Sequence, residues 1–131
     1  VIGDRYEINA TSLGPNTTVT AYMIAEGNDL DVSLFLTNGE QMPLTDENQA
    51  VIYCDDAGNS NVCWAEVSPL MDSDLTLFGG EIIRGGNRDA ALQLTPDNIS
   101  TYGGSVLRLL ATSYQQETIG NYVLVLHIGN R

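Results

Sequence analysis

Two pairs of aspartates, Asp29/Asp31 and Asp55/Asp56, carry the side chains in this sequence that are best suited to binding a metal ion. Calcium takes about six to eight oxygen ligands from carboxylates, amides and backbone carbonyls, often on loops where glycine permits a sharp turn. We therefore expect these four residues to be the candidate ligands of a calcium ion, provided that the fold brings the two pairs together. The alternative is that they form a solvated acidic surface. The second pair lacks the spacing of an EF-hand loop, because Gly58 comes too soon.

The two cysteines, Cys54 and Cys63, flank a polar loop. One histidine and two cysteines cannot supply the four ligands of a zinc site, so this spacing favours a disulfide that closes a loop between two strands. A disulfide implies an oxidising compartment, and a chain that starts at Val1 without a methionine or an apolar leader fits a mature secreted protein or a trimmed fragment. We expect an extracellular or cell-surface location.

Trp64 directly follows the second cysteine. A lone tryptophan beside a disulfide usually packs in the core. The alternative is an exposed aromatic contact for a sugar or a peptide.

A catalytic triad would need His127, because it is the only histidine. The alternation of Leu124, Leu126 and Ile128 places His127 on the opposite face of its strand from these core-facing residues. The sequence also contains no G-x-S-x-G elbow, no HExxH motif and no phosphate-binding loop. We expect that the protein is not an enzyme and requires no cofactor, with calcium as the one ion it would hold.

The charge is strongly acidic, with 17 acidic residues against five basic ones and a net charge of -12. All five basic residues are arginines. Binding to nucleic acid or to an anionic membrane depends on neutralising phosphates with Lys or Arg, so neither is an expected partner. No apolar run is long enough to span a membrane. The expected partners are a protein or polysaccharide surface, or copies of the same chain.

The elements that must position these residues are short strands, because apolar and polar residues alternate along most of the chain. The candidate strands cover residues 5–10, 18–25, 30–37, 50–54, 63–68, 75–83, 89–95, 105–112 and 121–128. Gly79-Gly80 marks either a bulge or a tight hairpin within this pattern. Eight or nine such strands predict one all-β domain over residues 1–131, a β-sandwich or jelly roll, with little or no helix beyond a turn near 96–101.

The C-terminal run LRLLATSYQQETIGNYVLVLHI resembles the last two strands of the bacterial pre-peptidase C-terminal (PPC) domain family. Two further segments are similar to the same family: Asp29-Leu30-Asp31 with the turn Asn38-Gly39, and Asp55-Asp56-Ala57-Gly58. The matching positions of the C-terminal run are Leu107, Leu109, Ala111, Thr112, Ser113, Tyr114, Thr118, Gly120, Asn121, Tyr122, Leu124 and Leu126. The chain departs from the family pattern by an insertion that we expect around 57–90.

The resemblance implies a jelly-roll-like sandwich of the kind appended to secreted proteases and other surface proteins. Such domains are usually non-catalytic, and some relatives bind collagen or calcium. We therefore expect an extracellular module for binding or adhesion at the bacterial cell surface. The alternative is a self-assembling structural subunit of an extracellular filament or surface layer, which polymerises through strand edges or strand exchange.

Overall fold

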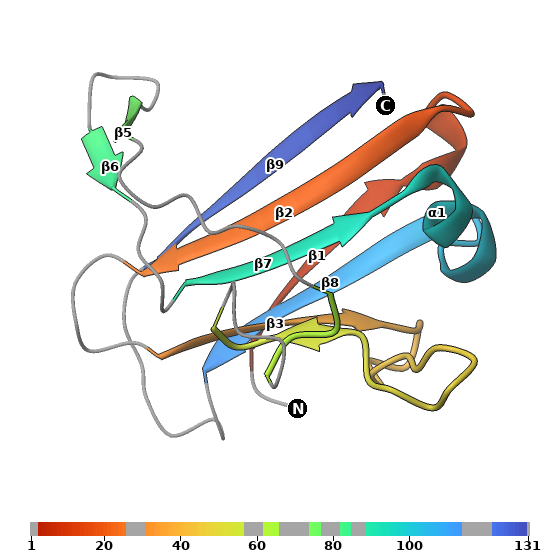
Figure 1. The fold of residues 1–131 in the computed structure, drawn as a ribbon, viewed down its shortest axis with the longest axis horizontal. Helices are drawn as coiled ribbons and strands as arrows, with labels where there is room; N and C mark the ends of the chain where they lie inside the picture. Colours follow the sequence, from red (N-terminus) through yellow and green to blue (C-terminus); the bar gives the residue numbers. More distant parts are fainter. Residues whose placement is uncertain are drawn as a thin grey trace.

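A computed structural model of the chain describes residues 3–25, 31–56, 62–65, 74–76, 82–84, 89–113 and 122–130. Figure 1 shows two layers of strands that face each other, with a short helix at one end. The fold is an all-β sandwich, as predicted. All of its paired strands run antiparallel. No described helix has the length and apolar run that a membrane span requires.

The larger sheet has four strands in the order β1-β8-β3-β4. Their bounds are Asp4–Asn9 for β1, Val106–Ser113 for β8, Val32–Thr37 for β3 and Tyr53–Cys54 for β4. The facing sheet has the order β7-β2-β9, formed by Ala90–Leu94, Thr17–Ala25 and Tyr122–Asn130. β5 (Asp74–Thr76) and β6 (Ile82–Arg84) form a separate two-stranded ribbon.

The core lies between the two sheets and is built by the alternation seen in the sequence. Val32, Leu34 and Leu36 on β3 are all 0% exposed, and most apolar residues of β2, β7 and β8 pack in the same cluster. Burying one such side chain stabilises the fold by about 1.5–3 kcal/mol relative to leaving it in water. The outward-facing Phe35 breaks the alternation by stacking on Tyr53, with ring centroids 5.4 Å apart.

The predicted strands agree with the observed ones within a few residues, with two exceptions. The segment predicted over residues 75–83 is not one continuous strand but a hairpin, which was one of the two alternatives for it, because the described residues form the antiparallel pair β5 and β6, in which Asp74 lies opposite Arg84. The predicted strand over 63–68 is described only at its start, where Cys63 makes an isolated bridge with Cys54. Residues 57–61, 66–73, 77–81 and 85–88 of the predicted insertion lie outside the described residues.

The last strand differs from its prediction in burial. Leu126 and Ile128 lie on the same face of β9 as Leu124, but they are 39% and 48% exposed. β9 is an edge strand of its sheet, so it has a neighbouring strand on one side only.

The predicted turn near 96–101 is a helix, α1, which spans Pro96–Tyr102. Thr95 caps its first turn by accepting a hydrogen bond from the Asn98 backbone N–H, and the Asn98 side chain accepts one from the Thr95 N–H. This reciprocal capping, with Pro96 at the first helical position, starts the helix.

A hydrogen-bonded group of side chains joins the two sheets between β1 and β9. The Tyr122 hydroxyl donates to an Asp4 carboxylate oxygen at 2.5 Å. Because a hydroxyl has one proton, the 2.5 Å contact between the Tyr6 and Tyr122 hydroxyls is then donated by Tyr6. Burial, and then the hydrogen bond to Asp4, raise the pKa of Tyr122 well above its usual range.

The raised pKa of Tyr122 predicts that the protein loses stability in alkali. The neutral phenol is favoured in the folded state, so its contribution is complete below pH 10.0, the ordinary tyrosine pKa, and is lost as the pH rises above it. Tyr122→Phe should lower the free energy of unfolding at pH 8 by about 1 kcal/mol and reduce its fall between pH 9 and 11. Urea denaturation at several pH values measures both. If the free energy of unfolding of Tyr122→Phe fell as steeply between pH 9 and 11 as that of the wild-type chain, the raised pKa of Tyr122 would be contradicted.

Candidate metal centre

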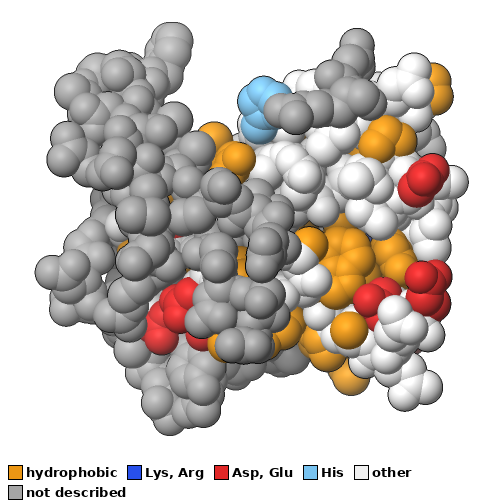
Figure 2. All heavy atoms as spheres, viewed as in Figure 1, with side chains coloured by type: hydrophobic (Ala, Val, Ile, Leu, Met, Phe, Trp, Pro, Cys, Tyr) orange, Lys and Arg blue, Asp and Glu red, His pale blue; other side chains and the backbone are white. Residues whose placement is uncertain are grey.

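Three of the four predicted metal ligands lie together at one end of the sandwich. Asp31 immediately precedes β3, and Asp55 and Asp56 immediately follow β4, so the antiparallel pairing of these strands brings the three carboxylates to the same end. One oxygen of each lies within 4.8 Å of the others. Figure 2 shows acidic side chains at the lower left, at the end where β3 begins in Figure 1. Asp29 lies outside the described residues.

Asp55 is the most deeply placed member of the cluster. It is 6% exposed, and its carboxylate accepts a hydrogen bond from the Ser33 hydroxyl at 3.2 Å. Because Leu34 pairs with Cys54, Ser33 and Asp55 lie opposite each other on the outer face of the larger sheet. Ser33 was not predicted as a member of this site, although the alternation puts it on the same face as Asp31.

The ligand set of this cluster favours a hard cation. All three side chains offer carboxylate oxygens, which calcium and magnesium prefer, whereas zinc and copper are usually held by nitrogen and sulfur. A divalent cation would also balance carboxylates that repel one another at this distance. Calcium suits such a site better than magnesium, because it accepts mixed carboxylate and carbonyl ligands in flexible geometry and gives up its water more readily.

The predicted disulfide joins Cys54 to Cys63 beside the cluster. Backbone hydrogen bonds hold the same region, from Asp55 N–H to the Val62 carbonyl at 2.9 Å and from Trp64 N–H to the Tyr53 carbonyl at 2.8 Å. The covalent bond and these hydrogen bonds restrict the backbone at Asp55. A restricted ligand lowers the entropic cost of binding an ion.

Trp64 is half-buried and packs against the core. Its indole N–H donates to an Asp46 carboxylate oxygen at 2.9 Å, and its ring meets Tyr102 edge-on with centroids 6.4 Å apart. The hydrogen bond from Trp64, and then those from the backbone N–H groups of Ala50 and Asn48, lower the pKa of Asp46. These contacts give Trp64 a packing role that ties the 46–50 turn to α1.

His127 is exposed and lies opposite Thr20 in the register of β2 and β9. Its position agrees with the face that the alternation predicts.

No family model, no curated protein and no solved structure matches this chain.

The cluster predicts that calcium stabilises the protein. A ligand that binds only the folded state adds about 2.7 kcal/mol at a concentration 100-fold above its Kd. The melting midpoint should therefore rise by several degrees in calcium relative to a chelator, and less in magnesium. Asp55→Asn should abolish the rise, and Glu40→Gln, which removes one charge on an exposed turn, should preserve it. A midpoint that is equal in calcium and chelator would rule out the ion.

Proposed function

We propose that this chain is a non-catalytic β-sandwich module that works outside the cell, where it binds or adheres to a protein or polysaccharide surface. In this proposal the module belongs to the PPC type and holds one structural calcium ion at Asp31, Asp55 and Asp56. The Cys54–Cys63 disulfide supports an extracellular location, since such bonds persist in oxidising compartments. The exposed position of His127 on an edge strand supports a non-catalytic role.

The convergence of the three carboxylates is the observation that supports this function most directly. A cation held there would tie the start of β3 to the end of β4 and would fix the backbone that leads into both neighbouring loops. Loops that a rigid scaffold positions are the usual place for binding residues in sandwich domains. The ion would therefore serve recognition indirectly, by ordering the end of the sandwich.

A second candidate function is self-assembly into a filament or surface layer, and the last strand favours it. β9 lies at the edge of its sheet and pairs with β2 over nine residues. Its sequence, YVLVLHIGN, contains no Lys, Arg, Asp, Glu or Pro. Edge strands are normally protected by such residues or by bulges, because an open edge can pair with another chain. A strand without charges can also approach its copy despite the net charge of -12.

Negative-stain microscopy and light scattering separate the two functions. The module function predicts monodisperse monomers at every concentration, with or without calcium. Filaments or tubes would contradict it and favour the structural subunit. In that case Leu126→Lys, which places a charge on the exposed half of β9, should dissolve the assemblies, and Met42→Lys, at a site that is 56% exposed on a turn, should leave them intact.

A further inference from the structure

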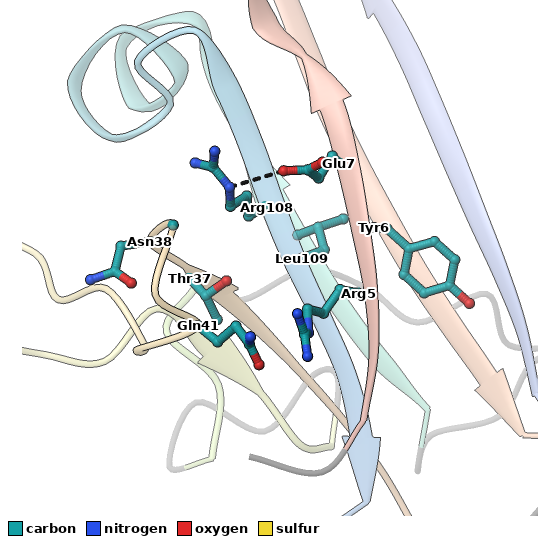
Figure 3. A pocket seen from close by; sticks show the side chains of 9 residues that line it. Arg5, Tyr6, Glu7, Thr37, Asn38, Gln41, Arg108 and Leu109 are labelled. Carbon is teal, nitrogen blue, oxygen red and sulfur yellow. Dashed lines mark hydrogen bonds and ion pairs between the residues drawn. The ribbon is translucent and has the colours of Figure 1, made fainter.

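A pocket lies on the outer face of the larger sheet, at the end of β3 opposite to the acidic cluster. Its volume is about 230 Å³. Figure 3 shows Arg5, Glu7 and Arg108 on the same side of the sheet as the turn that follows β3, whereas Tyr6 points to the opposite side. The polar side chains that line the pocket belong to Arg5, Glu7, Thr37, Asn38, Gln41 and Arg108.

The charge of this pocket is opposite to that of the protein. The chain has only five basic residues and a net charge of -12, yet two of the five arginines meet here. The pairing of β1 with β8 brings them together, since Arg5 lies opposite Leu110 and Glu7 opposite Arg108. With two arginines and one glutamate, the local balance is one positive charge.

The two guanidinium groups retain donors for a ligand. Arg108 donates from Nε to Glu7 Oε2 at 3.0 Å, and this is its one ion pair among the described residues. The pair fixes the guanidinium beside Gly39, where an added Cβ would lie 3.7 Å from Cζ. Arg5 is exposed and has no ion pair within the described part of the chain. An arginine has five N–H donors and no acceptor, so both side chains select an anion.

The end of β3 and the turn that follows it supply neutral donors. Thr37 is 6% exposed, and its side chain reaches this pocket without a hydrogen bond to any described residue. The Asn38 side-chain oxygen accepts hydrogen bonds from the N–H groups of Glu40 and Met42, at 2.8 and 3.0 Å, which holds the turn closed. Gln41 adopts φ 65°, and this conformation carries its amide toward Arg5 in Figure 3.

We propose that this pocket binds a carboxylate group of an acidic peptide segment in a partner protein. A carboxylate matches the planar fork of arginine in two parallel hydrogen bonds, and the Thr37 hydroxyl and Gln41 amide can donate to its remaining lone pairs. At 230 Å³ the pocket is smaller than a typical small-molecule site of about 300–1,000 Å³, and its size suits one acidic residue of a larger partner. Tyr6 is the aromatic residue among those that line the pocket, and its ring points to the opposite side of the sheet in Figure 3, which disfavours a sugar. The proposal names a partner class for the module function and rests on it.

The test is fluorescence anisotropy of a labelled hexaglutamate peptide with the intact chain in calcium. General charge attraction cannot explain binding, because both partners are acidic. The peptide should bind saturably, and the matched hexaglutamine peptide should not. Arg5→Gln and Arg108→Gln should each weaken binding about tenfold, which corresponds to the loss of one charged hydrogen bond. Arg131→Gln, which removes the same charge elsewhere in the sequence, should leave the affinity unchanged.

Two further measurements make the result decisive. Thr37→Val keeps the shape of the side chain and should weaken peptide binding several-fold. The melting midpoint of each variant confirms that it is folded. An oligogalacturonate of equal charge should compete poorly. Equal loss in Arg131→Gln, equal binding of the glutamine peptide, or tighter binding of the oligogalacturonate would each overturn the proposal. A monomeric, calcium-stabilised chain that binds no glutamate peptide would contradict this pocket alone and leave the module function standing.

Discussion

The burial of one face of β3 is the constraint on which the rest of the molecule depends. Val32, Leu34 and Leu36 are completely enclosed between the sheets, so the register of β3 with β8 and β4 cannot shift by one residue without exposing all three. The same register fixes the opposite face of the strand. Ser33 comes to lie against Asp55, and Thr37 comes to lie beside Arg108. The apolar core therefore determines where the polar side chains of β3 lie.

The two polar sites lie at the two ends of this strand and carry opposite charge. Asp31 and Thr37 are six residues apart, which in an extended strand is about 20 Å. At one end three carboxylates face one another, and at the other end two arginines stand in an otherwise acidic protein. A module with this arrangement would hold a cation and a partner's carboxylate at separate places on one rigid strand. Calcium at the first site would also reduce the net charge that repels an acidic partner from the second.

The fold was largely predictable from the sequence, because alternation survives wherever one face of a strand is buried. The exceptions show where local pattern is insufficient. The alternation of Leu126 and Ile128 indicates their face correctly, but whether that face is covered depends on the opposite sheet. The turn at Asn38-Gly39 was expected, yet the left-handed residue is Gln41 rather than the glycine. Hydrogen bonds from the backbone to Asn38 stabilise this turn, and Asp46 makes an equivalent pair ahead of Gln49.

The sites were predictable to different degrees for the same reason. Asp31 and Asp55 lie at the ends of two predicted strands that are neighbours in the sequence. The pairing of those two strands, β3 and β4, is enough to bring the carboxylates together. Arg5 and Arg108 are separated by almost the whole chain, and only the pairing of β1 with β8 brings them together. A single sequence contains no signal that predicts this pairing.

Isothermal titration of calcium into the wild-type chain and into Asp31→Asn tests whether the three aspartates form one cation site. The wild-type chain should bind one calcium ion, and the variant should bind at least tenfold more weakly. Heats that match simple dilution in the wild-type chain, or identical isotherms for the two proteins, would contradict this site.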